Sequence, residues 1–441
     1  MSANGSPARV LIAALALLTS ASATAADLLG TYQKAQQNDP QYAAARAQYR
    51  AAQEARPQAR AAVLPQVNLS ASVSENDYDG PTGNSQSFTS NEASLTLTQT
   101  LFNWRQFAGL DRASAQVAQA EAQLASAEQN LVTRVAQAYF DVLSAADGLR
   151  FAQAEKKAIG RQLEQAKQRF DVGLIPITDV KAAQASYDLA TSREISAQNQ
   201  VENAREALRT IINEPPGSLA TLSEGRPPLD RPQPAAPEEW VQRALEQNPE
   251  YLAARSGAEA ARYGIKEARA GHYPNVDLVA RHSESEDSNG PGTGDITNNS
   301  IGVQVTLPLF SGFATTSQTR QAQAQFDQAR SQVVQARRGA EQGTRDAYRG
   351  VEASISQVTA LQQAVESNRA AVESTQAGFR VGTRTAVDVL NALRDLYGAQ
   401  RDLADARYNY ILNRLRLKQA AGTLTVEDVR LVNSWLSSPS D

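Results

Sequence analysis

The chain has 441 residues, a formal net charge of −4 and a hydrophobic fraction of 41% that leans on alanine, with only 6% aromatic residues. It contains no cysteine, so disulfides, thiol chemistry and a lipidated N-terminal cysteine are excluded. This composition favours long helices over a thick globular core. Charges of both signs are interspersed, which argues against a basic surface for nucleic acid.

Residues 1–26 have the features of a secretory signal peptide. A polar start with Arg9 precedes the apolar run Val10–Leu18, and small residues follow as far as Ala26. The apolar run is too short to span a membrane. We therefore expect an exported chain that begins near Asp27, without a transmembrane helix, because no other apolar run approaches the required length.

The first structural repeat is expected over residues 27–213. An Ala/Gln/Arg-rich helical stretch runs to about residue 62, and after Pro65 apolar and polar residues alternate. This alternation predicts strands at about 66–76 and 92–102. The Gly/Pro/Asn-rich segment between them is typical of a solvent-exposed loop.

A very long helical run, Asn103–Phe170, follows the second strand and should extend about 100 Å, which is typical of a rod. A hairpin tip at about 171–178 reverses the chain, and a return helix at Ile177–Asn213 completes an antiparallel hairpin. The next segment, residues 214–237, contains seven prolines. We interpret it as a linker or strap rather than a core element.

The second structural repeat, residues 238–424, has the same order. The motif at Gln36–Arg46 returns at Glu246–Arg255, with Pro40 and Pro249 separated by 209 residues. The turn sequences RFDVGLIPITDV and GFRVGTRTAVDV fall in register at that offset, so one unit is written twice. The predicted elements are helical residues 238–271, strands at about 275–284 and 299–310, a helical run at Phe313–Phe379, a hairpin tip at about 380–387, a return helix at Thr385–Ala421, and a C-terminal segment at 425–441.

The four strands admit two interpretations. They could form a small sheet packed on the chain's own helices, as in a soluble protein. Alternatively lipid covers their apolar face, since each segment is near ten residues long and has an apolar face opposite a Ser/Thr-rich one. Four strands cannot close a barrel, so a chain in lipid must oligomerise. A dimer gives eight strands with a filled interior, and a trimer gives twelve with a lumen.

The repeated order of helix, strand pair and long hairpin resembles the TolC family of outer-membrane channel proteins, closest to the protein that gives the family its name. The motifs that carry the likeness are PQVNL, LTQTLF, QAYFDVLSAAD, RFDVGLIPITDV, VGTRTAVDVL and LADARYNYI, and it covers essentially the mature chain. The resemblance implies a mainly α-helical homotrimer with a twelve-stranded β-barrel in the outer membrane and a periplasmic α-helical barrel. The proline-rich linker, residues 214–237, would belong to the equatorial region.

The implied function is the exit duct of a tripartite efflux pump, a type I secretion system, or both. The implied partners are outer-membrane lipid, a periplasmic adaptor (membrane fusion) protein and an inner-membrane ABC or RND-type transporter. The resemblance places adaptor docking at the hairpin tips, at Val172, Gly173, Leu174, Val381, Gly382 and Thr383. Whether drugs, other small molecules or proteins are exported depends on the pump.

The resemblance also implies a gate where the tips converge at a closed periplasmic end. Arg384 matches an arginine that links to the neighbouring hairpin through the positions of Thr178 and Asp179. Asp388 matches a carboxylate that projects into the constriction. Three such carboxylates would form an acidic ring, whose mutual repulsion raises some of their pKa values and attracts multivalent cations.

The chain departs from the family at two gate positions. Phe379 stands where the name-giving protein has a tyrosine whose hydroxyl takes part in the latch, and Asn391 stands where it has a second aspartate. Phenylalanine cannot donate that hydrogen bond, and asparagine carries no charge. We therefore expect a weaker latch and a weaker cation block.

A purely structural explanation of the same turns stays open. Pro176 suits the first turn of a helix. Thr385 and Asp388 have the spacing of a capping box, in which an acid also complements the helix dipole. Gly173 and Gly382 would supply the permissive backbone of the turns. On this interpretation the aspartates only start helices.

The sequence offers little other chemistry. It has no Gly-rich phosphate loop, nucleophile elbow or metal-ligand motif. We interpret His272 as a solvated junction residue and His282 as a strand residue. We expect no enzymatic activity, no cofactor, no metal site and no nucleic-acid partner. The alternative function is a periplasmic coiled-coil adaptor or structural protein.

Overall fold

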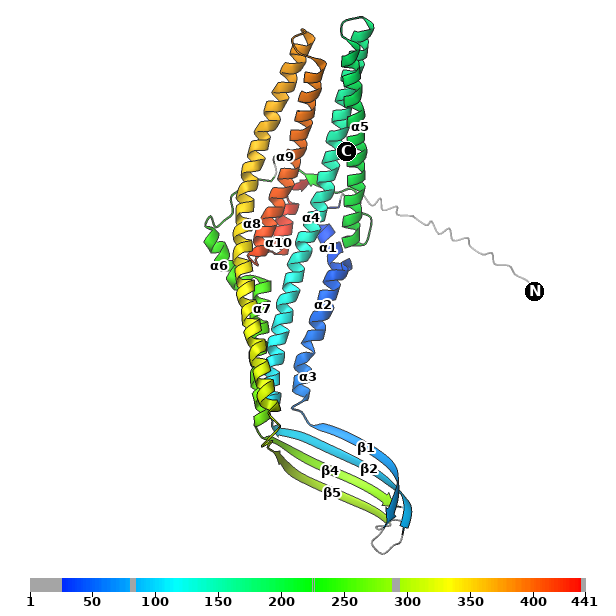
Figure 1. The fold of residues 1–441 in the computed structure, drawn as a ribbon, viewed down its shortest axis with the longest axis vertical. Helices are drawn as coiled ribbons and strands as arrows, with labels where there is room; N and C mark the ends of the chain where they lie inside the picture. Colours follow the sequence, from blue (N-terminus) through cyan, green and yellow to red (C-terminus); the bar gives the residue numbers. More distant parts are fainter. Residues whose placement is uncertain (1–25, 80–84, 224, 226, 288–293, 438–441) are drawn as a thin grey trace, which may run out of the picture.

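The computed structural model describes residues 26–79, 85–223, 225, 227–287 and 294–437. These residues form an elongated molecule with a sheet at one end and two long helical hairpins that reach the other (Figure 1). Shorter helices pack beside the middle of the long ones and beside the half of them that is nearest the sheet. The predicted signal peptide, residues 1–26, lies outside the described residues except for Ala26.

Each half of the chain has the predicted order of helices, strand pair and hairpin, so the mainly α-helical, internally repeated fold is confirmed. The first half consists of α1 (Leu28–Asn38), α2 (Pro40–Gln53), α3 (Ala55–Ala61), β1 (Gln66–Asp79), β2 (Ser85–Phe102), α4 (Trp104–Asp171) and α5 (Ile177–Ile212). The second half consists of α6 (Pro237–Gln247), α7 (Pro249–Arg269), a 3₁₀ turn (Ala270–His272), β4 (Asn275–Asp287), β5 (Gly294–Thr306), α8 (Ala314–Arg380) and α9 (Ala386–Ala420). The linker holds β3 (Thr221–Leu222), and the C-terminal segment holds α10 (Val426–Asn433) and β6 (Leu436–Ser437).

The four hairpin helices begin and end within one residue of the bounds expected from the sequence. The helical stretches before the strands are divided instead. Asp39 and Asn248 end one helix and cap the next, because each side chain accepts a hydrogen bond from the amide three residues later. Pro40 and Pro249 take the first helical position, where a missing amide hydrogen costs nothing. No helix in these described ranges is both long and apolar enough to cross a membrane.

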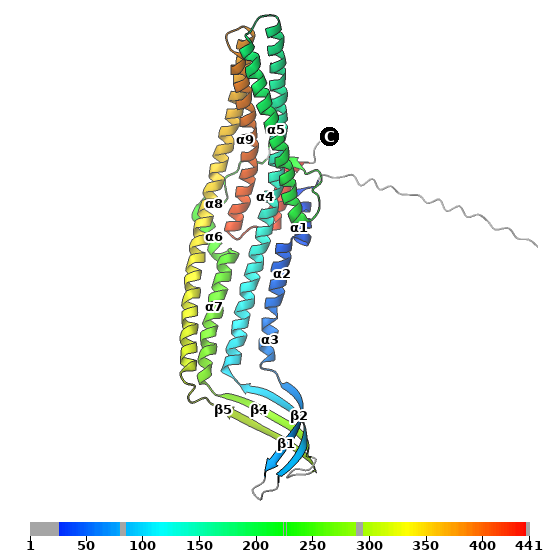
Figure 2. The same cartoon turned by 45° about the vertical axis from the view of Figure 1, so that its right-hand side comes forward.

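The sheet is antiparallel throughout, in the order β1-β2-β4-β5, so the β2–β4 pairing joins the two repeats. Its register puts Leu69 opposite Leu95, and Ala280 opposite Ile301, on one face. The sheet projects beyond the ends of the helices (Figures 1 and 2). Its apolar face is exposed, so the interpretation of a sheet packed on the chain's own helices is wrong. The exposed large side chains of this face, the apolar belt, are Val67, Leu69, Val73, Leu95, Ile301, Val303 and Val305.

The strands extend further into the Gly/Pro/Asn-rich segments than the alternation predicts. β1 continues to Asp79 and β2 begins at Ser85, because polar residues stay paired across the strands, for example through a hydrogen bond from Ser87 to Asp77. β4 likewise continues to Asp287 and β5 begins at Gly294, before the predicted 299. The predicted end of β5 at 310 is wrong: the strand ends at Thr306, since Pro308 lacks the amide hydrogen that a ladder requires.

The main apolar core lies in the middle of the molecule, where α1, α10 and the linker meet the hairpin helices. The repeat-related Tyr139 and Tyr348 donate hydrogen bonds to the linker carbonyls of Ala220 and Ala235. The linker is thus hydrogen-bonded to both repeats, in agreement with its interpretation as a strap. The expectation that it lies outside the core is wrong at one point, because Leu219 is buried there among the helices.

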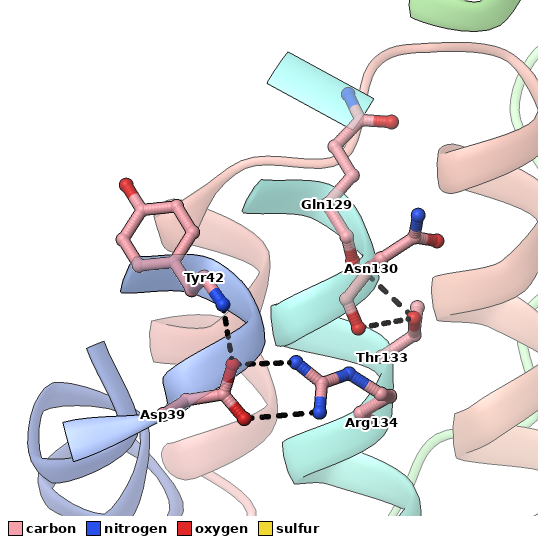
Figure 3. Close-up of polar contacts among 6 residues, drawn as sticks. All are labelled: Asp39, Tyr42, Gln129, Asn130, Thr133 and Arg134. Atoms are coloured by element: carbon pink, nitrogen blue, oxygen red, sulfur yellow. Dashed lines mark hydrogen bonds and ion pairs between the residues drawn. The ribbon is translucent and has the colours of Figure 1, made fainter. Parts of the chain in front are cut away.

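A buried ion pair secures the junction of α1 and α2 in the first repeat only. The carboxylate of Asp39 accepts two hydrogen bonds from Arg134 of α4, at 3.0 and 2.8 Å, and also caps α2 (Figure 3). Its side chain is only 3% exposed. The positions 209 residues later hold Asn248 and Gly343, so the second repeat keeps the cap and loses the ion pair.

Candidate functional site

The two hairpin tips lie at the same end of the molecule, opposite the sheet, in both views (Figures 1 and 2). The first tip joins α4 to α5, and the second joins α8 to α9. Two sequences 209 residues apart thus present their turns side by side. This is the arrangement that a gate made of hairpin tips requires.

The first tip is a glycine turn. Gly173 has a φ of +75°, a conformation that L side chains rarely adopt, which explains this residue in the turn. The amide of Leu174 bonds back to the carbonyl of Arg169 at 2.9 Å and closes the helix. Pro176 then starts α5, with Asp179 in the first helical turn. Thr178 is exposed and Asp179 is half-buried.

The second tip has the same turn and a stronger helix cap. Gly382 has a φ of +81°. The hydroxyl of Thr385 accepts from the amide of Asp388 at 3.2 Å, and the carboxylate of Asp388 accepts from the amide of Thr385 at 2.9 Å. This capping box confirms the structural explanation of the Thr-x-x-Asp spacing. The side chain of Asp388 is half-buried at the tip.

The local electrostatics favour a charged Asp388 in a single chain. Hydrogen bonds from the backbone and side chain of Thr385 lower the pKa of its carboxyl group, and the nearby Arg384 adds to the effect. The rise in pKa expected from an acidic ring requires three chains. Within the part of one chain that the structure describes, no hydrogen bond or ion pair joins Arg384 to Thr178 or Asp179. A latch between these residues would have to join different chains.

The predicted docking residues form an exposed apolar surface on both tips. Val172, Leu174 and Val381 are among the most exposed large apolar side chains outside the sheet. Thr383 and the two turn glycines lie beside them and are exposed as well. Such residues at a helix hairpin end give a partner apolar area to bury.

The two residues that depart from the family pattern have different surroundings. Asn391 is exposed on α9, one turn after Asp388. Phe379 is buried near the end of α8 against Val372 and Leu393. The guanidinium carbon of Arg169, on α4, lies 4.4 Å from the centroid of the Phe379 ring.

Arg169 is the residue near the tips that sequence reasoning missed. A signal was available, because the two turn sequences match at the phenylalanine but differ just before it, where Arg169 corresponds to Gly378. Arg169 also lines a groove of about 920 Å³ between α4, α8 and α9. None of the residues lining this groove is acidic.

The two histidines lie in different elements of the second repeat. His272 is exposed in the 3₁₀ turn, and His282 lies in β4, where its Nδ1 is 2.6 Å from Oδ1 of Asn299. Among the described residues, no group of three or more His, Asp or Glu side chains is arranged to hold a metal ion.

The chain is similar to known outer-membrane proteins over nearly its whole length. Residues 31–214 and 240–423, which correspond to the two repeats, match the outer membrane efflux protein family. The chain is 41% identical to the outer membrane protein TolC of Vibrio cholerae, over 96% of this chain and 97% of that protein. It is 30% identical to the alkaline protease secretion protein AprF of Pseudomonas aeruginosa, over 96% of this chain and 90% of that protein.

A solved structure has the same fold. The outer membrane protein VceC of Vibrio cholerae superposes with a TM-score of 0.78 at 24% identity, over 90% of this chain and 96% of that chain.

Proposed function

The chain belongs to the outer membrane efflux protein family, and from this premise we infer that it is an outer-membrane channel for efflux, type I secretion or both. Proteins of this family are outer-membrane channels, and we propose a transport role without catalysis. One similar protein is named for the outer membrane and another for the secretion of a protease. The apolar belt of the sheet is the single observation that carries this proposal.

Lipid is the environment that the apolar belt requires. Its side chains share one face, while the other face carries polar contacts such as the 2.8 Å hydrogen bond between Ser70 and Ser94. β1 and β5 are edge strands, whose outward backbone groups need partners in a bilayer. The sheet must therefore close with sheets of other copies, which excludes a soluble adaptor for this chain.

The unequal packing of the two repeats supports a ring of chains. α7 packs against both α4 and α8 of its own chain, whereas its counterparts α2 and α3 pack against α4. If the two repeats pack alike, the side of α2 and α3 that faces away from α4 would meet α8 of a neighbouring chain. Three chains then give twelve strands with a lumen and six hairpins around one tunnel. We propose this homotrimer as the functional unit.

The six tips would form the gate at the periplasmic end. Arg384 is exposed and would bond to Thr178 and Asp179 of the neighbouring chain. Three Asp388 carboxylates would line the aperture and attract multivalent cations. Each hydrogen bond contributes little free energy, so an adaptor that binds the open form more tightly can shift the equilibrium from closed to open. Because this chain has Phe379 and Asn391 at two gate positions, its latch and its block by cations should be weaker than in relatives that have tyrosine and aspartate there.

The exposed tips are the proposed docking surface for a periplasmic adaptor. Val172, Leu174 and Val381 would be buried against the adaptor. The adaptor would connect the channel to an inner-membrane ABC or RND-type transporter, which selects the substrate.

Fractionation and mass measurement test the proposal. We expect the protein in the outer-membrane fraction, soluble only in detergent, with a native mass of three chains. Recovery as a soluble monomer after osmotic shock would contradict both the channel and the trimer.

A further inference from the structure

Close to the tips, the two hairpins of a single chain meet through the apolar cluster that holds Leu390 of α9, and through a second, cationic contact. Arg169 lies in the last turn of α4, and its guanidinium carbon is 4.4 Å from the centroid of the Phe379 ring in the last turn of α8. A cation over the face of an aromatic ring at this distance is attracted by the negative charge of the π system. The contact therefore links the first repeat to the second.

The two partners are held differently. Phe379 is only 7% exposed and belongs to an apolar cluster that is formed mostly by its own hairpin, including Val372 and Leu393, together with Ala158 of α4. Arg169 is half-buried, and within the described residues no carboxylate pairs with its guanidinium. The ring is thus held mainly by its own hairpin, while the cation comes from the other hairpin.

The internal repeat does not reproduce this contact, because only one of the two equivalent residue pairs contains an arginine. The position equivalent to Phe379 is Phe170, which is 39% exposed, and among the residues that the structure describes no cation lies over its ring. The position equivalent to Arg169 is Gly378, which has no side chain to offer. A Cβ at 378 would lie 2.7 Å from Cγ of Arg384, so a larger residue there would displace the proposed latch arginine. A junction between neighbouring chains that is built on the same repeat would therefore lack this ring-bound cation.

We propose that Arg169 and Phe379 form a tether between the two hairpins of each chain, which is made when the tips are closed and breaks when the gate opens. This inference rests on the proposed channel function and adds a positioning residue, Arg169, to its gate. The tether also gives the aromatic ring at 379 a role that needs no hydroxyl group. It compensates in part for the hydrogen bond that phenylalanine cannot donate.

Single-channel recording of the purified protein in planar bilayers tests the tether. Arg169→Leu and Phe379→Leu should each shift the closed-to-open equilibrium toward opening by about two- to fivefold per chain, the effect of one exposed cation–π contact. The double variant should open no more than either single variant, because both remove the same contact. Arg169→Lys keeps a cation and should stay close to the unaltered protein. Phe379→Tyr keeps the ring and adds the latch hydroxyl, so it should favour the closed state at least as much as the unaltered protein does.

Lys167→Leu is the matched control, since it removes one exposed positive charge two residues before Arg169. Additive effects of Arg169→Leu and Phe379→Leu would overturn the tether, and so would an equal effect of the control or of Arg169→Lys. If Phe379→Leu fails to assemble, the comparison of Arg169→Leu with Arg169→Lys and Lys167→Leu still decides. Absence of any conductance from the unaltered protein would instead overturn the proposed channel function, and the tether with it.

Discussion

The carboxylate of Asp388 accepts a hydrogen bond from the backbone amide of Thr385, and the hydroxyl of Thr385 accepts one from the amide of Asp388. The residue proposed to line the aperture is therefore also the cap of α9. A substitution that removes its charge can disturb the helix as well. Separating the two roles requires variants that change one and keep the other.

The first prediction concerns inhibition by multivalent cations. Asp388→Asn keeps a side-chain oxygen for the cap but removes the charge, so block by a trivalent cobalt complex should be lost. Thr385→Ala breaks the cap and keeps the charge, so block should persist. Titration of the single-channel current with the complex checks both. Equal loss of block in the two variants would mean that the cap, and not an acidic ring, matters.

The second prediction concerns the apolar belt. Ile301→Arg places a charge on the face proposed to meet lipid and should destabilise the inserted protein by about 2–4 kcal/mol. Asn298→Arg, on the opposite face of the same strand and paired with Ser283, should change stability little, because that side chain would face the lumen. Urea titration of refolding into lipid vesicles measures both. Equal costs would argue that neither face meets lipid.

The third prediction concerns the ion pair between Asp39 and Arg134. Asp39→Ala removes the buried pair and a helix cap and should cost about 3 kcal/mol. Asp39→Asn copies the second repeat, keeps the cap and should cost less. Thermal unfolding followed by circular dichroism compares them. If both variants cost the same, the cap contributes little.

The same pair predicts a pH dependence. Burial opposes ionisation of Asp39, but hydrogen bonds from Arg134 and the amide of Tyr42 outweigh it and lower the pKa of the carboxyl group. A lowered folded-state pKa means that the stabilisation is complete above the ordinary value near 3.8 and is lost as the pH falls through the folded value. The Asp39→Asn variant should show a smaller loss of stability between pH 5 and pH 2. An unchanged loss would place the acid sensitivity elsewhere.

The fourth prediction concerns docking at the tips. Leu174→Asp together with Val381→Asp puts charges on the exposed apolar surface and should reduce export from cells roughly tenfold or more, as loss of a central interface anchor does. Conductance of the purified channel should be unchanged, because neither residue belongs to the proposed latch. A parallel fall in conductance would assign these residues to the gate instead.

The sequence predicts best those features that depend on residues close together in the chain. The hairpin helices were predicted to within one residue because their ends depend on local signals such as Gly173 and the Thr385–Asp388 spacing. The added length of β1 and β2 was missed because cross-strand pairing such as Asp77 with Ser87 is not visible in local alternation. The contact of Arg169 with Phe379 joins residues 210 positions apart, which no local pattern encodes. The latch itself stays a prediction, because its contacts would join different chains.

Conductance of the Arg384→Ser channel tests the central account most directly. Loss of the latch arginine should raise the conductance or open time of the bilayer-inserted trimer about tenfold, the effect of losing a charge-assisted hydrogen bond. Lys181→Ser, an exposed charge near the other tip, should leave both unchanged. Equal conductance of Arg384→Ser and the unaltered protein would contradict a gate closed by the tips.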